Sequence, residues 1–157
     1  MQTVTIDDVD VPTANPAERV CPLSDALETT DLAINYYVLG PGEQFGFDLH
    51  THHDQEEVFY VRSGTATFET ETDSIDVHAG EVVRFAPGEF QIGRNEGDEH
   101  VRAIALGAPR ETMEIEYLRE CPTCDERTVQ PLAPFRETGA FVVTCATCGT
   151  ETIREER

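Results

Sequence analysis

Two histidines and a glutamate have the types and spacing of a metal site. His50, His52 and Glu57 lie in the run HTHHDQEE. Alternate residues of an extended strand project to one face, so His50 and His52 point the same way, and Glu57 opens the next predicted strand. Two imidazoles and one carboxylate converging inside a barrel form a facial set, which suits a divalent first-row metal and leaves positions open for substrate, water or O2. We therefore predict a mononuclear metal site here.

Four of the five cysteines form two C-x2-C pairs that are separated by 20 residues, namely Cys121, Cys124, Cys145 and Cys148. Four thiolates at this spacing close a tetrahedral zinc site, and Pro122 and Gly149 favour the tight turns that such pairs need. Because a four-thiolate site has no open position, we predict a structural zinc. Disulfides or a thioredoxin-like redox pair are the alternatives. Cys21 stands alone and is predicted to be a small buried apolar residue.

The cysteine pairs belong to a stretch that resembles a zinc ribbon, over residues 119–157. Within it, a turn at Thr138-Gly139 separates residues 127–134 from residues 141–144, as in a short β-hairpin. The stretch carries many acidic and few basic side chains. We therefore expect it to contact protein, self-associate or cover the barrel mouth, rather than bind nucleic acid.

The remaining sequence predicts short β-strands that hold the candidate ligands. Runs of β-forming residues recur at intervals of about 8 to 12 residues with turn signals between them, which is typical of an all-β sandwich or barrel. The runs cover residues 31–39, 45–52, 57–62, 65–70, 74–78, 82–85, 90–94, 101–106 and 113–118, and residues 24–28 are the best short helix candidate. We predict a leader with an edge strand in residues 1–17, a barrel in 18–118 and the ribbon in 119–157.

The histidine segment resembles the first motif of the cupin family, G-x5-H-x-H-x(3,4)-E-x6-G. His50, His52, Glu57 and Gly64 match its spacing, whereas Gln44 stands where the leading Gly is expected. The resemblance covers residues 30–107. It implies a double-stranded β-helix, or jelly-roll, barrel with the metal in its mouth, commonly as a homodimer. It does not select an activity, because this fold supports many.

The second cupin motif, G-x5-P-x-G-x2-H-x3-N, aligns on Gly80, Gly88 and Asn95, with Ala86 in place of its Pro and Gln91 in place of its third His. A Gln carbonyl oxygen is a neutral, hard and weaker ligand than imidazole. As a fourth ligand, Gln91 favours Mn(II) or Fe(II) over Cu(II), with Ni(II) or Zn(II) as alternatives. Its alternative role is a pocket residue that hydrogen-bonds a ligand or water. The alternative for the whole site is a barrel that holds an organic ligand without metal.

Strand alternation assigns the neighbours of these ligands. It turns His53 and Glu56 away from the site, and it places one of the consecutive Tyr36 and Tyr37 inside. The remaining assignments are apolar pocket walls at Phe59 and Val61, and surface or structural roles at His78 and His100.

The charge of the chain argues against several partners. It has 31 acidic residues, 11 arginines and no lysine, for a formal net charge of -20. Such a surface repels phosphate polyanions and anionic lipid, so neither nucleic acid nor membrane is expected as the main partner. Because salt screens this repulsion, the composition resembles that of proteins from halophiles. The sequence shows neither a membrane-length apolar segment nor a signal-peptide pattern, so we expect a cytoplasmic protein.

Together these features predict a metal-binding barrel that holds a small oxygen-bearing ligand, with dioxygenase, isomerase or decarboxylase chemistry as the enzymatic candidates. The alternative is a non-catalytic module that senses a small molecule or a metal and contacts a protein partner through its ribbon.

Overall fold

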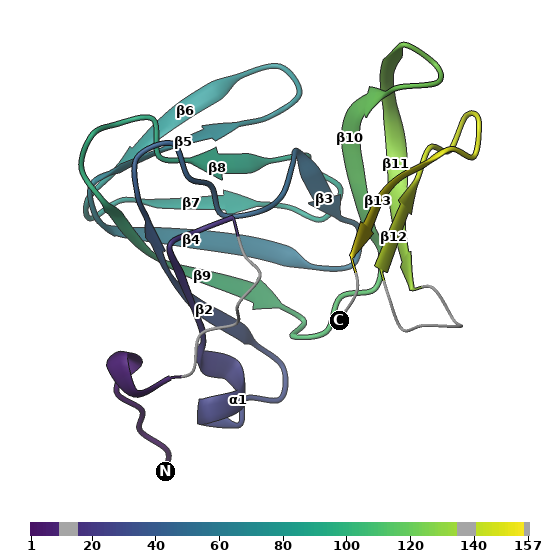
Figure 1. The fold of residues 1–157 in the computed structure, drawn as a ribbon. Coiled ribbons are helices and arrows are strands. Elements are labelled where there is room, and N and C mark those ends of the chain that lie inside the picture. Colours follow the sequence, from purple (N-terminus) through teal and green to yellow (C-terminus); the bar gives the residue numbers. More distant parts are fainter. Residues whose placement is uncertain (10–15, 135–140, 156–157) are drawn as a thin grey trace.

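The computed structural model describes residues 1–9, 16–134 and 141–155, and these residues form an all-β fold, as predicted (Figure 1). Short helices are confined to the N-terminal part. The elements are η1 (Ile6–Asp8), β1 (Arg19–Pro22), α1 (Leu23–Leu27), β2 (Ala33–Leu39), β3 (His50–His52), β4 (Glu56–Ser63), β5 (Thr65–Glu69), β6 (Ser74–His78), β7 (Val82–Phe85), β8 (Ile92–Arg94), β9 (Val101–Ala108), β10 (Ile115–Cys121), β11 (Glu126–Pro134), β12 (Phe141–Thr144) and β13 (Glu151–Glu155).

Two sheets enclose the barrel core. One has the strand order β1-β2-β9-β4-β7 and the other β6-β5-β8. Aromatic rings fill the space between them, with ring centroids 4.9 Å apart for Phe59 and Phe68 and 5.5 Å apart for the stacked Phe45 and Phe68. Gly93 on β8 makes room for these rings, since a Cβ there would lie 2.5 Å from Phe68 Cε1. These rings belong to the hydrophobic core of the barrel.

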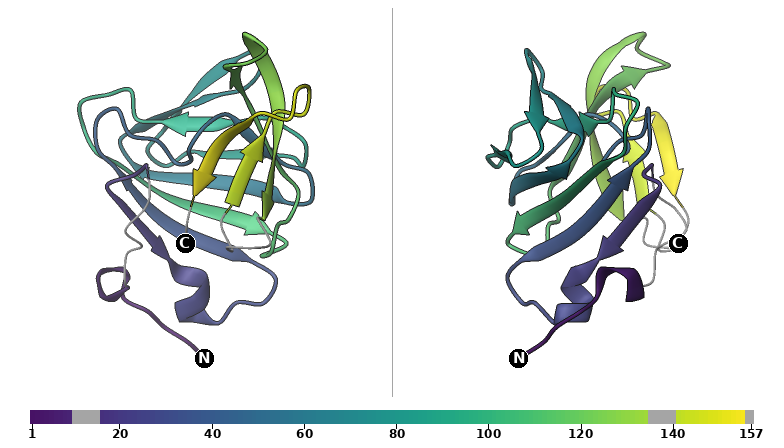
Figure 2. Two further views of the ribbon diagram at one scale, coloured as in Figure 1. Left: turned by 45° about the vertical axis from the view of Figure 1, so that its right-hand side comes forward. Right: turned by 90° about the vertical axis from the view of Figure 1, so that its left-hand side faces the viewer.

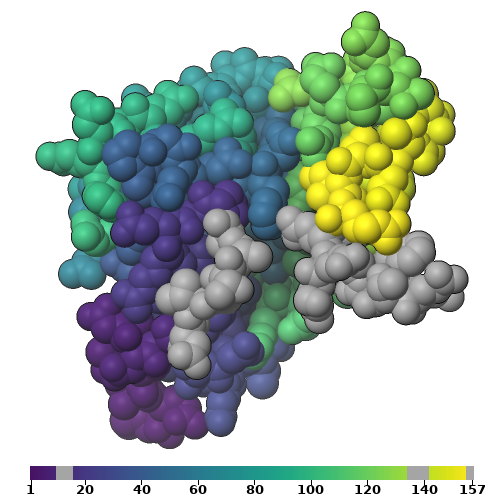
Figure 3. Space-filling view, viewed as in Figure 1, coloured from purple at the N-terminus to yellow at the C-terminus, as the bar shows by residue number. Residues whose placement is uncertain are grey.

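The third sheet joins the ribbon to the barrel, in the order β13-β12-β11-β10-β3. The ribbon strands stand beside the barrel in the ribbon views and pack against it in the space-filling view (Figures 2 and 3). Strand β10 crosses the boundary that we placed between residues 118 and 119, so the two parts share a strand. Strands β11 and β12 pair antiparallel, as the predicted hairpin requires, while its turn at Thr138-Gly139 lies outside the described residues.

The leader, residues 1–17, is described at residues 1–9 and 16–17. In the described residues of the range 1–17 the structure has the 3-10 helix η1 and no strand, and the edge strand β1 follows at Arg19–Pro22. Val4 and Ile6 pack against a second apolar cluster, which includes Tyr36 of β2 and is separate from the barrel core. The pattern missed this packing because the apolar residues of the leader are too sparse to show a period.

Strand lengths follow the predictions closely except at the histidine segment. Strands β6 and β7 have the predicted bounds, whereas β3 is limited to His50–His52 within the predicted run 45–52. The residues that were predicted as strand but are not, 45–49, lie between two isolated bridges. One joins Gln44 to Arg94, and the other joins His50 to Gln91. Because the chain has more residues between the bridges on the Gln44–His50 side, it bulges there, and Phe45 and Leu49 turn into the core.

Candidate metal centres

The barrel brings its three predicted ligands together. His50 and His52 on β3 and Glu57 on β4 each offer a ligand atom, and these atoms all lie within 4.8 Å of one another. The distance from His52 Nε2 to Glu57 Oε1 is 3.8 Å. All three side chains are partly buried, so they face a cavity rather than open solvent. The three residues thus converge, and their role as a facial set of metal ligands stays a prediction.

Hydrogen bonds at the far side of each imidazole leave its Nε2 available for a metal. His50 Nδ1 lies 2.8 Å from the carbonyl oxygen of Asp48, so Nδ1 carries the proton and donates it. His52 Nδ1 lies 3.1 Å from Thr112 Oγ1, and the Thr112 hydroxyl donates to Asp54 Oδ1 at 2.6 Å. Since that hydroxyl already donates to a carboxylate, it accepts from His52 Nδ1. Metal-binding histidines in proteins are held in this way.

The pKa shifts of His52 and Asp54 favour a neutral imidazole and a charged carboxylate in the hydrogen-bonded relay that joins them through Thr112. Burial lowers the pKa of His52, which favours the neutral imidazole that a metal needs. The hydrogen bonds from Thr112 and from the backbone N–H of Met113 lower the pKa of Asp54, so its carboxylate stays charged and accepting. The relay is therefore set for metal binding at neutral pH.

Gln91 lies beside the three ligands, where the sequence placed it, and is 2% exposed. Its amide Nε2 donates to Glu57 Oε2 at 2.8 Å and lies 3.5 Å from His50 Nε2. Its Oε1 is buried without a hydrogen-bond partner. A half turn of the amide would exchange the two atoms and direct the oxygen to the ligand atoms. The position suits a fourth ligand, and that role stays a prediction.

A cavity of about 280 Å³ opens in front of these residues. Phe45, Phe59 and Leu106 supply apolar walls, and Asn35 and Tyr37 add polar groups. Burial and, secondarily, the charge of Glu57 raise the pKa of Tyr37 to about 12. Its phenol therefore keeps its proton at neutral pH and can donate a hydrogen bond into the cavity.

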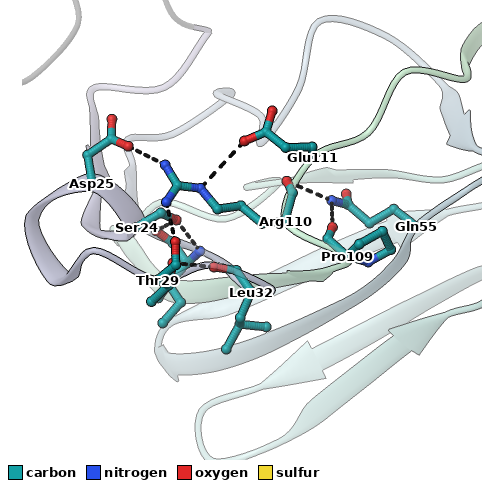
Figure 4. A network of polar contacts seen from close by, with 9 residues as sticks. Ser24, Asp25, Thr29, Leu32, Gln55, Pro109, Arg110 and Glu111 are labelled. Carbon is teal, nitrogen blue, oxygen red and sulfur yellow. Dashed lines mark hydrogen bonds and ion pairs between the residues drawn. The ribbon is translucent and has the colours of Figure 1, made fainter.

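A polar network fixes the rim of this cavity (Figure 4). Arg110 donates to the carbonyl oxygen of Thr29 and to Asp25 on α1, and its Nε lies 3.6 Å from Glu111 Oε1. Gln55, which is 5% exposed, donates from Nε2 to the carbonyl oxygen of Pro109 at 2.6 Å. These bonds hold the segment that leads to Thr112, and hence to His52.

Sequence reasoning missed the residues that support the ligands. Asp54, Gln55, Arg110 and Thr112 were not predicted, because they reach the site through contacts between residues far apart in the chain. The only available signal was the concentration of polar residues after the histidines. Of the two consecutive tyrosines, Tyr37 lines the cavity, and Tyr36 is buried in the outer cluster.

The other assignments agree with the structure in most cases. Phe59 lines the cavity, whereas Val61 is fully buried in the barrel core. Three histidines lie on the surface with polar partners, namely His53 with Glu116, His78 with Thr65 and His100 with Glu18. Glu56 forms an ion pair with Arg84 and turns away from the site.

The four ribbon cysteines also converge, with their sulfur atoms all within 4.8 Å of one another. The Sγ–Sγ distances are 3.6 Å between Cys121 and Cys148 and 3.8 Å between Cys124 and Cys145. A tetrahedral zinc with bonds of about 2.3 Å requires sulfur atoms about 3.8 Å apart, so the cluster fits the ion. All five cysteines are free thiols in this structure, and Cys21 is fully buried, as predicted.

The two cysteine pairs adopt matching turns. The N–H of Asp125 donates to the carbonyl of Cys121 at 2.9 Å, and that of Gly149 donates to the carbonyl of Cys145 at 2.8 Å. Both donors have positive φ, 57° and 74°. A hydrogen bond from Thr128 lowers the pKa of Cys145, whereas a hydrogen bond with Cys148 raises the pKa of Cys124, so the metal-free cluster favours the thiolate at Cys145 and not at Cys124.

In the described part of the chain, no helix is long and apolar enough to cross a membrane.

The fold is a jelly-roll barrel, and two histidines and one carboxylate that could hold a metal ion converge in it. Residues 35–107 match the family model of the cupin domain. This segment is therefore similar to the cupin domain, as its two motifs indicated. A search of the curated proteins found no match to the sequence.

Solved structures share the fold at low sequence identity. A sugar phosphate isomerase from a cupin superfamily, from Silicibacter pomeroyi, is 17% identical with a TM-score of 0.62, and the alignment covers 96% of this chain and 91% of that chain. A predicted oxalate decarboxylase from Thermotoga maritima is 19% identical with a TM-score of 0.60, over 69% of this chain and 99% of that chain. A Klebsiella pneumoniae protein with a double-stranded β-helix domain is 22% identical with a TM-score of 0.57, over 72% and 88%. These likenesses confirm the fold.

Proposed function

We propose that the barrel holds one divalent first-row metal through His50, His52 and Glu57, and a small oxygen-bearing substrate in the cavity in front of it. The hydrogen bonds that occupy Nδ1 of both histidines carry this proposal, because they turn both Nε2 atoms toward the carboxylate. Mn(II) or Fe(II) are the favoured ions, with Ni(II) or Zn(II) as alternatives, and Gln91 is the proposed fourth ligand.

The cavity residues support an enzyme rather than a binding module. Tyr37 presents a protonated phenol to the cavity beside Glu57 and is placed to donate a proton or to anchor a substrate oxygen. A metal bound here supplies Lewis acidity toward a carbonyl or enolate oxygen, or activates O2. The volume of about 280 Å³ suits a small molecule. The names of the similar structures, an oxalate decarboxylase and a sugar phosphate isomerase, concern small oxygen-rich molecules as well. We propose dioxygenase, isomerase or decarboxylase chemistry.

Elemental analysis tests the metal proposal. Wild-type protein and a chain with His50→Ala and His52→Ala are purified in high salt, and metals are measured per chain. We expect one zinc that survives the double substitution and a second metal that is lost with it. A folded wild type that holds only one zinc, and takes up no second metal when it is offered, would refute the proposal.

Two further variants separate the roles of the cavity residues. Gln91→Ala lowers metal affinity if the amide oxygen is a ligand, and unchanged affinity would make Gln91 a pocket residue. Tyr37→Phe keeps the metal and lowers turnover if the phenol acts as an acid or anchor. A Tyr37→Phe chain that retains full turnover on the substrate identified by screening would exclude that role. If screening yields binding without turnover in the wild type, the sensing module is favoured.

A further inference from the structure

The histidine-bearing strand is the edge strand of the ribbon sheet. In the order β13-β12-β11-β10-β3, β3 pairs with β10, with Ile115 opposite His52 and Tyr117 opposite His50. In the described residues, the backbone of β3 also bonds to the barrel: His50 and Gln91 exchange two hydrogen bonds, and the Gly88 N–H donates to the carbonyl oxygen of His52 at 3.0 Å. The histidine strand therefore lies between the two parts of the protein. The backbone groups of His50 and His52 bond to the barrel, and the carbonyl oxygen of the adjacent Leu49 accepts from Leu118 of β10.

Side chains of β10 reinforce this pairing. The ring of Tyr117, which is 8% exposed, packs on the ring of His50 with centroids 5.9 Å apart. Arg119 Nε lies 3.5 Å from Asp48 Oδ2, and the backbone carbonyl of Asp48 is the group that holds His50 Nδ1. The same strand thus supports His50 through one aromatic and one ionic contact.

The far end of β10 carries one cysteine of the candidate zinc cluster. Cys121 is the last residue of the strand and belongs to the four-cysteine cluster. Between the two ends, the fully buried Gln130 on β11 donates to the carbonyl oxygen of Arg119 at 3.2 Å, which ties β10 into the ribbon. Closure of the cluster by zinc fixes the position of Cys121, and therefore the strand that positions the histidines.

We propose that the ribbon zinc positions the barrel histidines, so that zinc in the cysteine cluster raises the affinity of the barrel for its own metal. This inference rests on the proposed function of the barrel. Arg119 and Tyr117 are the positioning residues, since they touch His50 or the group that orients it. By thermodynamic linkage, a barrel metal must tighten the ribbon zinc by the same factor. Couplings between sites in proteins are typically about 5- to 150-fold.

The test measures Mn(II) affinity of the full-length chain by electron paramagnetic resonance of free Mn(II). Mn(II) is a suitable probe because hard ions avoid the thiolate cluster, whereas one equivalent of zinc prefers it. The wild type is compared with one zinc per chain and after removal of zinc. We expect Mn(II) affinity at least five-fold higher with zinc. In the reciprocal measurement, Mn(II) is expected to raise the zinc affinity of the cysteines by the same factor, measured by equilibrium competition with a chelator, and this effect disappears with His50→Ala and His52→Ala.

Removal of zinc could unfold the ribbon, so a second variant tests the coupling in the zinc-loaded chain. Arg119→Met keeps the cysteines and one zinc but removes the contact with Asp48. We expect it to bind Mn(II) at least five-fold more weakly than the wild type. Arg19→Met is the matched control, because the side chains of Arg19 and Arg119 are both 28% exposed and each pairs with one aspartate, and Arg19 contacts Asp7 in the leader. The control is expected to bind Mn(II) like the wild type.

The outcomes separate the two proposals. Mn(II) affinity that agrees within two-fold with and without zinc in folded protein overturns the coupling and leaves the barrel metal site standing. Agreement within two-fold between zinc-loaded Arg119→Met and the wild type also overturns it. A folded wild type that binds no Mn(II) in either state overturns both.

Discussion

Replacing Thr112 with Val tests the hydrogen-bond relay behind His52. Val keeps the shape of the side chain but removes the hydroxyl that accepts from His52 Nδ1 at 3.1 Å and donates to Asp54 Oδ1 at 2.6 Å. The Nδ1–H of a side chain that is 12% exposed then loses its acceptor. Leaving a buried donor unpaired costs about 1–3 kcal/mol, and about 1.4 kcal/mol corresponds to a tenfold change in affinity. We expect roughly a 10- to 100-fold loss of metal affinity, the range seen when such supporting groups are removed.

The assay is titration of the zinc-loaded chain with Mn(II) at neutral pH. Thr112→Ser restores the hydroxyl and should bind Mn(II) close to the wild-type affinity. Thr67→Val is the control, because it removes a similar hydroxyl-to-carboxylate bond, 2.7 Å to Asp76, on the exposed face of the β5–β6 hairpin. Mn(II) affinity of Thr112→Val within two-fold of the wild type would refute the reasoning, since His52 would then hold its orientation without the relay.

Three predictions concern stability. Gly93→Ala places a Cβ 2.5 Å from a core aromatic ring and should lower the free energy of unfolding by about 1–3 kcal/mol, measured by urea titration. Gly97→Ala is the control and should change this free energy little, because its Cβ would have its nearest contact at 3.6 Å. Gly107→Ala brings a Cβ to 2.7 Å from Gln55 Cδ, so it should lower the urea midpoint as well, and an unchanged midpoint would show that the amide can move aside. Asn95→Ala leaves the carbonyls of Leu39 and Glu99 without their donor and should cost about 1–3 kcal/mol, measured by thermal unfolding.

Much of the barrel could be predicted from local patterns. Alternation of apolar and polar residues together with turn residues gave the bounds of β6 and β7, because each of these strands lies between sharp turns. The ligand set followed from the spacing of His50, His52 and Glu57, since strand geometry alone brings the two imidazoles to one face. The cysteine spacing likewise predicted a cluster that the structure brings together.

The supporting contacts could not be predicted, because they depend on long-range register. Nothing in the local sequence of Thr112 marks it as a partner of His52, which lies 60 residues earlier. The pairing of β3 with β10 is equally hidden, since a three-residue strand has no pattern that selects its neighbour. The shortening of β3 depends on the bridges from Gln44 to Arg94 and from His50 to Gln91. More residues lie between them on the Gln44–His50 side than on the other, and these pairings are known only from the fold.

The place of β3 in the ribbon sheet also affects the order in which the protein can mature. The two histidines are synthesised early, but the hydroxyl that orients His52 follows 60 residues later, and the strand that pairs with them follows directly after that hydroxyl. At a translation rate of about 5–20 residues per second, the histidine strand waits about 3 to 12 s for its partner. Long-range pairings of this kind form late in folding. The nascent barrel therefore has both candidate histidine ligands before the strand that pairs with them emerges. Under the proposed function, the complete metal site would form only after that strand has been synthesised.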